Sequence, residues 1–267
     1  MRTKRRRTSG GPKKGIYILP NLFTSASLFG GFYAIIAAIQ GRYESAAIAI
    51  LVSCVFDALD GKIARITGST SDFGMEYDSL SDLVAFGVAP GILAFQWALE
   101  PFGRFGWLAC FMYVICGALR LARFNIQKKT LEANYFKGLP IPSAASFIAA
   151  LILFSSTLGG FAEFRHVLLI FIMYLLSFLM VSTIDYLSFK ELDLKKQRPF
   201  SVFVEVILIL LVIAYKPKVM LFFLLIIYIL SGPVITIYRH HKKRVGPVEP
   251  VRPETQRNAM DTPNEGA

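Results

Sequence analysis

The sequence predicts an all-α integral membrane protein with about eight transmembrane helices and both termini in the cytoplasm. The first observation is compositional: 54% of the 267 residues are hydrophobic and the mean hydropathy is +0.52, yet the formal net charge is +11. The second is that the apolar residues form runs of about 17–20, the length that spans a hydrocarbon core of about 30 Å. The third is that basic residues fall between these runs, mostly on one side of the implied membrane. A soluble domain would instead interrupt such runs with charge every few residues.

Eight apolar runs are expected to form the helices, and they cover residues 22–39, 45–66, 80–99, 106–124, 143–158, 167–186, 202–215 and 219–238. The fifth and seventh runs are shorter than the others. The first run is long and no small-residue cleavage site closes it, so we expect an uncleaved anchor rather than a signal peptide. The cysteines fall within apolar runs, without metal-ligand spacing, and are expected to be buried, reduced thiols: Cys54, Cys110 and Cys116.

Basic residues set the predicted orientation. Of the 29 Lys and Arg residues, 24 lie in the N-terminal segment, the even-numbered connections or the C-terminal tail; the opposite side has Arg42, Arg104, Arg165, Lys216 and Lys218. By the positive-inside rule both termini then face the cytoplasm, in agreement with an even number of helices. The basic N-terminus could instead be a nucleic-acid-binding arm. A topology determinant that contacts anionic lipid headgroups is the favoured interpretation, so no nucleic-acid partner is expected.

Four aspartates interrupt the second and third apolar stretches. A carboxylate at bilayer depth costs roughly 2.5–3.5 kcal/mol, so four of them indicate a functional site. Asp57 and Asp60 share one face of a helix, and Asp78 and Asp82 share one face of the next. The short polar segment 67–72 makes these two helices antiparallel neighbours, so their acidic faces are expected to meet near the cytoplasmic boundary.

The residues around the acids suit a phosphorylated ligand. Carboxylates without His or Cys favour Mg²⁺, Mn²⁺ or Ca²⁺ over zinc. Gly61, Ala64 and Gly74 leave room near the backbone, and Arg65 offers a planar cation for phosphate oxygens. Taken alone, Gly61 and Ala64 could be a helix-packing seam, and Arg65 could be a snorkelling residue at a helix end. The joint pattern instead predicts a pyrophosphate site.

The complete pattern resembles the signature of the CDP-alcohol phosphotransferase family, with no departure at its eight defining positions: Asp57-x2-Asp60-Gly61-x2-Ala64-Arg65-x8-Gly74-x3-Asp78-x3-Asp82. Members of that family transfer a substituted phosphate from a CDP-linked donor to an alcohol and release CMP. The resemblance implies a core of six membrane helices, which commonly forms a homodimer. The two further helices predicted at the C-terminal end fit some branches of the family.

The resemblance also assigns roles to individual residues. Asp57, Asp60 and Asp78 are expected to bind one or two Mg²⁺ or Mn²⁺ ions, and Asp82 to act as a ligand, as the general base, or as both. The residues expected to contact CDP-diacylglycerol are Asn21, Thr24, Gly61, Ala64, Arg65, Ser71 and Gly74. Helix capping is the alternative role for Asn21 and Thr24.

Residues outside the signature predict the acceptor. The stretches 20–24, 117–125 and 138–145, and the run 86–90, resemble the phosphatidylserine synthase branch of the family. This resemblance implies transfer of the phosphatidyl group to the hydroxyl of L-serine, with phosphatidylserine and CMP as products. Arg120 and Arg123, three residues apart near a helix end, could hold the serine carboxylate together with Asn125. Their alternative roles are topology determinants or contacts to lipid phosphate.

Two other functions remain as alternatives. The same chemistry could use glycerol 3-phosphate, inositol phosphate or choline as the acceptor. A cation transporter could also place acids at membrane depth, but the second half of the chain has no matching acid pair, and transport would proceed without CMP release.

The favoured prediction is a multi-pass enzyme of the inner cell membrane whose active site faces the cytoplasm. It comprises a basic cytoplasmic segment (1–19), a single transmembrane catalytic domain (20–240) and a disordered cytoplasmic tail (241–267).

Overall fold

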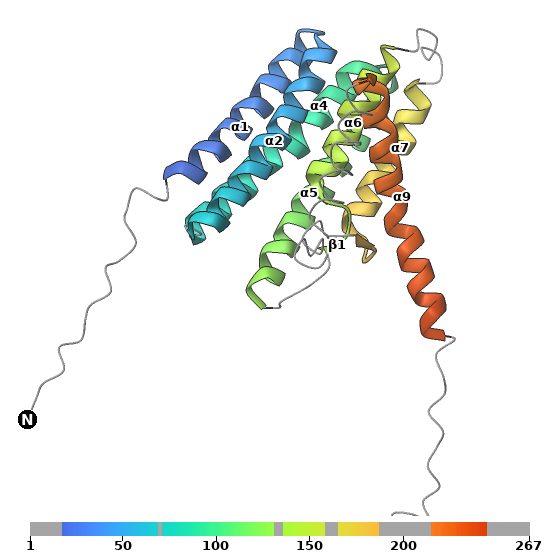
Figure 1. Ribbon diagram of the computed structural model, residues 1–267. Helices are drawn as coiled ribbons and strands as arrows, with labels where there is room; N and C mark the ends of the chain where they lie inside the picture. Colours follow the sequence, from blue (N-terminus) through green and yellow to red (C-terminus); the bar gives the residue numbers. More distant parts are fainter. Residues whose placement is uncertain (1–17, 69–70, 131–135, 158–164, 187–214, 245–267) are drawn as a thin grey trace, which may run out of the picture.

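The computed structural model describes residues 18–68, 71–130, 136–157, 165–186 and 215–244, and Figure 1 shows them as a bundle of long helices. The α-helices are α1 (Ile18–Ile39), α2 (Tyr43–Thr67), α3 (Asp72–Asp82), α4 (Ala89–Ala94), α5 (Arg104–Thr130), α6 (Ile141–Ser155), α7 (Arg165–Val181) and α9 (Pro217–Arg244). The π-helices η1 (Leu83–Val88) and η2 (Phe95–Leu99) join α3 and α4 into one continuous helical stretch, which ends in the 3₁₀ turn η3 (Glu100–Phe102). An antiparallel pair of two-residue strands, β1 (Phe136–Lys137) and β2 (Asp185–Tyr186), is the exception to an otherwise helical architecture in the described residues.

Helices form at seven of the eight predicted runs, whereas the run 202–215 lies outside the described residues except for its last position. Four described helical stretches are long and apolar enough to cross a membrane: Pro20–Ile39, Asp72–Phe102, Arg104–Gln127 and Pro217–Thr236. The charges of the acid motif lower the hydropathy of α2, and α6 and α7 have only 15 and 17 residues. Apart from the short strand pair, the described residues are therefore helical, as in a membrane protein, while the count of eight spans and the orientation of the termini remain predictions.

Glycines and one serine set the sharp corners around α2. Gly41, with φ of 73°, turns the chain between α1 and α2, so these helices pack as antiparallel neighbours. Gly68 ends α2 in the left-handed conformation, with φ of 62°, and donates its N–H to the Ala64 carbonyl. Ser71 then begins α3, because its Oγ accepts a hydrogen bond from the Gly74 N–H at 3.0 Å. The α2–α3 corner brings the two halves of the acid motif together.

Small side chains let α1 approach α2 and η1 closely. A Cβ on Gly31 would lie 2.5 Å from the Cα of Ala85, and one on Gly30 would lie 2.3 Å from the Oγ of Ser53. Ser27 donates to the Ser53 carbonyl at 3.1 Å, and Ser81 donates to the Thr24 carbonyl at 3.1 Å. In a membrane, small residues and hydroxyl hydrogen bonds of this kind hold helices together.

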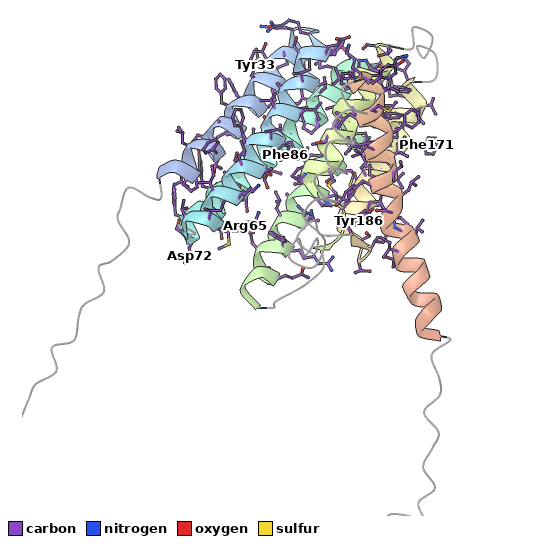
Figure 2. The ribbon with its side chains drawn as sticks, viewed as in Figure 1. Tyr33, Arg65, Asp72, Phe86, Phe171 and Tyr186 are labelled. Carbon is purple, nitrogen blue, oxygen red and sulfur yellow. The ribbon has the colours of Figure 1, made fainter. Side chains whose placement is uncertain are left out.

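The core lies between η1, α5 and α6. Phe86, at the middle of the bundle in Figure 2, is fully buried, and its carbonyl accepts a hydrogen bond from the buried Tyr113 hydroxyl of α5 at 3.0 Å. Helix α6 is buried along most of its length. Protein rather than lipid therefore surrounds this helix, which explains why a short apolar segment suffices there.

The described ends of the chain lie at the same end of the bundle. Figure 1 shows the start of α1 and the end of α9 at the lower end of the view, where α2, α5 and α7 also finish. At the opposite end, Lys218 of α9 lies 3.0 Å from Glu44 of α2 and 3.3 Å from the Ser156 hydroxyl. This arrangement agrees with the predicted topology, in which the basic connections gather on one side.

All three cysteines are free, as predicted. Cys110 and Cys116 are buried, and Cys54 is partly buried.

Candidate active site

Three aspartates from two helices converge at the α2–α3 corner. Asp57 and Asp60 of α2 and Asp78 of α3 each offer a carboxylate oxygen, and these three oxygens all lie within 4.8 Å of one another. Asp60 is buried, with 6% of its surface exposed. Carboxylates this close repel each other strongly unless a cation lies among them, and hard oxygen ligands suit Mg²⁺ or Mn²⁺. The donor set therefore fits a divalent metal ion.

Asp82 lies beside this group rather than within it. Its carboxyl group shares a hydrogen bond with that of Asp57, and Asp78 acts on it electrostatically. Asp82 ends α3 and directly precedes the π-helix η1. π-Helical turns are frequent at functional sites, because they shift the register of the side chains that follow. Of the four predicted acids, Asp57, Asp60 and Asp78 thus form the compact set, and Asp82 is hydrogen-bonded to one of its members.

Thr24 holds Asp60 in place. Its Oγ1 donates to Oδ2 of Asp60 at 2.5 Å and lies 3.2 Å from the Pro20 carbonyl, and the residue is only 3% exposed. Because α1 begins at Ile18, Thr24 and Asn21 lie inside the helix and cap nothing. Thr24 therefore orients an acid of the cluster, a contact that sequence spacing alone does not indicate.

Asn21 lies at the start of α3. A Cβ on Gly74 would come within 3.4 Å of the Asn21 Oδ1 and within 3.1 Å of the Ser71 Oγ. Ser71 acts as the N-cap of α3, so its hydroxyl has a structural role in addition to any contact with a ligand. The first helix and the α2–α3 corner are thus adjacent. The predicted donor site requires this, because it uses residues from both.

The predicted phosphate-binding residues lie on the open side of α2. Apart from its chain neighbours and the nearby backbone of α2 itself, no described atom lies within 4 Å of the position that a Cβ on Gly61 would occupy. Arg65 is exposed, and its Nε donates to the Gly61 carbonyl at 2.8 Å, which fixes the guanidinium against its own helix. Figure 2 shows Arg65 near the same end of the bundle as Asp72, the first residue of α3. Ala64, one turn beyond Gly61, is partly buried. This side of α2 leaves space for a ligand beside the acids.

The three predicted serine-binding residues have different partners. Arg120 is buried and interacts electrostatically with Asp82 and Asp57. Arg123 instead donates its Nη1 to the carbonyls of Val181 and Ser182, at 3.3 and 3.5 Å. A cation there offsets the negative end of α7.

Asn125 is bonded within the bundle, because its Nδ2 donates to the Ser79 Oγ at 2.9 Å. Of the three residues, Arg120 is therefore the one that these contacts link to the acids.

Sequence reasoning missed two hydroxyl groups, of which one interacts electrostatically with Arg120 and the other is hydrogen-bonded to the first. Tyr228 of α9 interacts electrostatically with Arg120, and its side chain is hydrogen-bonded to that of Ser143 at the start of α6. Ser143 falls within the stretch 138–145, one of those whose sequence predicted the acceptor. Tyr228 stands in an apolar run without any motif, so only the packing of α9 reveals its position.

Known proteins resemble this chain in sequence. The CDP-alcohol phosphatidyltransferase family matches residues 17–181 of the chain. The CDP-diacylglycerol–serine O-phosphatidyltransferase of Helicobacter pylori (strain ATCC 700392 / 26695) is 36% identical over 221 residues, which cover 83% of this chain and 92% of that protein. The enzyme of the same name from Bacillus subtilis is 37% identical over 173 residues, which cover 65% of this chain and 92% of that protein.

An archaeal relative has a related name. The archaetidylserine synthase of Methanothermobacter thermautotrophicus is 39% identical over 170 residues, which cover 63% of this chain and 69% of that protein. Helix α9 lies beyond the residues that the family matches.

Proposed function

Since the chain belongs to the CDP-alcohol phosphatidyltransferase family, we propose that it transfers the phosphatidyl group of CDP-diacylglycerol to L-serine, giving phosphatidylserine and CMP. The observation that carries this proposal is the convergence of Asp57, Asp60 and Asp78 from two helices. Asp82 lies beside them, and the buried Arg120 interacts electrostatically with Asp82. The relatives from Helicobacter pylori and Bacillus subtilis are named as serine O-phosphatidyltransferases, and the similarity covers 92% of each. This similarity supports serine as the acceptor.

The donor binds at the α2–α3 corner. Asp57, Asp60 and Asp78 hold one or two Mg²⁺ or Mn²⁺ ions, with Thr24 orienting Asp60. A divalent ion bound there offsets the negative charge of the pyrophosphate and of the departing CMP. The open face at Gly61 and Ala64 lets the nucleotide approach the backbone of α2, and Arg65 contacts its phosphates. Asn21, Ser71 and Gly74 complete this binding surface.

Asp82 accepts the proton of the acceptor. The serine hydroxyl oxygen attacks the phosphorus that bears the diacylglycerol, the bond from that phosphorus to the CMP oxygen breaks, and the hydroxyl proton passes to the Asp82 carboxylate. The position of Asp82 beside the three-acid set, hydrogen-bonded to Asp57, supports this assignment. A positioned general base typically contributes 10²–10⁴-fold to a rate.

Arg120 binds the serine carboxylate. It is buried and lies within electrostatic reach of Asp82, so a carboxylate bound there would place the serine hydroxyl near the proton acceptor. Arg123 and Asn125 support the same region through their contacts with α7 and α3. Neither residue need touch the substrate for this role.

The site works at the cytoplasmic face of the inner cell membrane. The acyl chains of the donor stay in the bilayer while its nucleotide enters from the side where the basic connections gather. We include in the proposal the cytoplasmic termini, eight membrane spans and a homodimeric state.

The test is a direct assay of the lipid product. The purified protein is given CDP-diacylglycerol with labelled serine, glycerol 3-phosphate, inositol phosphate or choline, and both the lipid and CMP are identified. We expect phosphatidylserine and CMP in equal amounts, and only with serine. A different labelled lipid would disprove the acceptor while leaving the family intact, and cation flux without CMP release would disprove the enzyme.

A further inference from the structure

Arg120 has a buried charge whose hydrogen bonding is incomplete. The residue is 8% exposed, its Cζ lies 5.7 Å from the centroid of the Phe124 ring, and its buried Nε has no hydrogen-bond acceptor among the described residues. A buried donor on a charged group is costly unless it finds an acceptor. A ligand with anionic oxygens would supply that acceptor.

Helix α9 brings a hydroxyl group to the same place. The Tyr228 side chain is hydrogen-bonded to the Ser143 side chain of α6, and Tyr228 and Arg120 interact electrostatically. Arg120 lies on α5, Ser143 on α6 and Tyr228 on α9, so these interactions link polar groups from three separate helices. A guanidinium and a tyrosine hydroxyl can both donate hydrogen bonds to a carboxylate.

The position of Tyr228 is fixed by the strand β2. The Tyr186 ring lies 5.8 Å from the Tyr228 ring, centroid to centroid, and the Tyr186 hydroxyl donates to the Ile229 carbonyl at 3.3 Å. Figure 2 shows Tyr186 beside α9. Gly232 lets the two approach, because a Cβ there would lie 2.4 Å from the Cε1 of Tyr186. Tyr228 is thus held in one orientation by packing rather than left free on a surface.

We propose that Tyr228 and Ser143 form the acceptor subsite together with Arg120, so that α9 determines the selectivity of the enzyme for an alcohol that bears a carboxylate. This inference rests on the proposed function, and it assigns a role to a helix that the family match does not cover. The carboxylate of serine binds Arg120 and accepts a hydrogen bond from the Tyr228 hydroxyl, whose oxygen accepts one from Ser143. The serine hydroxyl then lies toward Asp82, which also interacts electrostatically with Arg120.

The experiment compares two tyrosine variants of the full-length enzyme. Tyr228→Phe keeps the ring against Tyr186 and removes the hydroxyl, so the KM for serine should rise about 10- to 100-fold, the effect of losing a hydrogen bond to a charged group. The KM for CDP-diacylglycerol should stay unchanged. Tyr174→Phe, the same chemical change at an exposed position of α7, is the matched control, and its KM for serine should stay within about twofold of the wild-type value.

Selectivity gives an independent measurement. Serinol has the alcohol and amine of serine but no carboxylate, so the preference of the enzyme for serine over serinol should fall at least about tenfold in Tyr228→Phe. Ser143→Ala should also raise the KM for serine and lower the preference for serine over serinol. This variant tests the subsite without changing an aromatic ring.

Each outcome separates this inference from the proposed function. A wild-type enzyme that makes no phosphatidylserine overturns the proposed function, and the serine subsite with it. A serine-transferring enzyme whose Tyr228→Phe and Ser143→Ala variants keep the wild-type KM and selectivity overturns the subsite alone. A raised KM for CDP-diacylglycerol, with that for serine unchanged, also overturns it, because the group would then bind donor phosphate.

Discussion

Asp57 and Asp82 illustrate how single residues divide the work of the site. Both are acids on membrane helices, yet Asp57 belongs to the set of three oxygens within 4.8 Å, whereas Asp82 only shares a hydrogen bond with it. The spacing of the motif places all four acids on two facing helices, but it does not distinguish a ligand from a base.

Asp82→Asn tests the proton-accepting role. The amide has nearly the same shape but cannot accept the proton, so kcat should fall at least about 100-fold while the KM for CDP-diacylglycerol changes little. The matched control is Asp72→Asn, the same chemical change on the same helix at an exposed position, which should keep near-normal kcat. Steady-state assays of CMP release measure both. Near-normal turnover in Asp82→Asn would remove this residue from the role.

Thr24→Val tests the orientation of Asp60. Valine keeps the volume but loses the hydroxyl that donates to Asp60 at 2.5 Å. Groups that orient a metal ligand typically contribute 10–100-fold in metal affinity or activity, so half-maximal activity should require roughly tenfold more Mg²⁺. Thr24→Ser should restore the wild-type metal dependence, because it returns the hydroxyl. An unchanged Mg²⁺ titration in the valine variant would show that Asp60 needs no such support.

Gly61→Ala separates a binding role from a packing role. Apart from its chain neighbours and the nearby backbone of α2, no described atom lies within 4 Å of the new Cβ, and alanine favours a helix by about 1 kcal/mol over glycine, so the thermal stability should hold or rise. The KM for CDP-diacylglycerol should nevertheless increase, because the methyl group occupies the space of the nucleotide.

The contrast is Gly31→Ala, where the Cβ would lie 2.5 Å from the Cα of Ala85 and the melting temperature should fall. A Gly61→Ala enzyme with wild-type donor KM would favour the helix-packing role of this glycine.

At the scale of elements, helices α2 and α6 show that both the burial and the hydropathy of a helix are needed to judge whether it spans the membrane. Helix α6 has 15 residues and is nearly all buried, so it needs no long lipid-facing surface. Helix α2 has 25 residues but carries the charges of the site, and those charges lie toward one end, where the α2–α3 corner gathers them. Counting apolar runs in the sequence identifies both segments as helices. It does not show which of them is surrounded by protein and which carries the charges of the site.

Gly232→Val tests how α9 is held. A Cβ at this position would meet three atoms of the fully buried Tyr186 ring within 2.8 Å, and overpacking of this kind typically costs about 1–3 kcal/mol. The melting temperature in detergent should fall, and the KM for serine should rise because Tyr228 shifts. Val234→Ala, a change at an exposed position two residues away, should do neither. A stable Gly232→Val protein with unaltered KM would mean that α9 tolerates displacement.

At the scale of the whole molecule, we expect a metal ion to hold helices α1, α2 and α3 together. Asp57 and Asp60 of α2 and Asp78 of α3 bind it, and Thr24 of α1 donates to Asp60. If it binds the folded state alone, an ion at 100 times its dissociation constant stabilises that state by about 2.7 kcal/mol. Adding Mg²⁺ or Mn²⁺ to chelator-treated protein should therefore raise the melting temperature and restore activity. Asp78→Asn should lose most of the thermal shift. An equal shift in that variant, or full activity in chelator, would contradict a metal site at these acids.

The sequence by itself determined the helices, the acid motif and the family, because each depends on local patterns: the length of apolar runs, the three- and four-residue spacing of acids, and a fixed signature. It predicted that two acidic faces meet, and they do. Only the tertiary structure decided which three acids lie within 4.8 Å of one another, that Thr24 donates to Asp60, that Arg120 and Arg123 have different partners, and that Tyr228 interacts electrostatically with Arg120. The physical reason is that these contacts join residues from different helices, and the packing of small and large side chains, rather than any spacing along the chain, sets their distances.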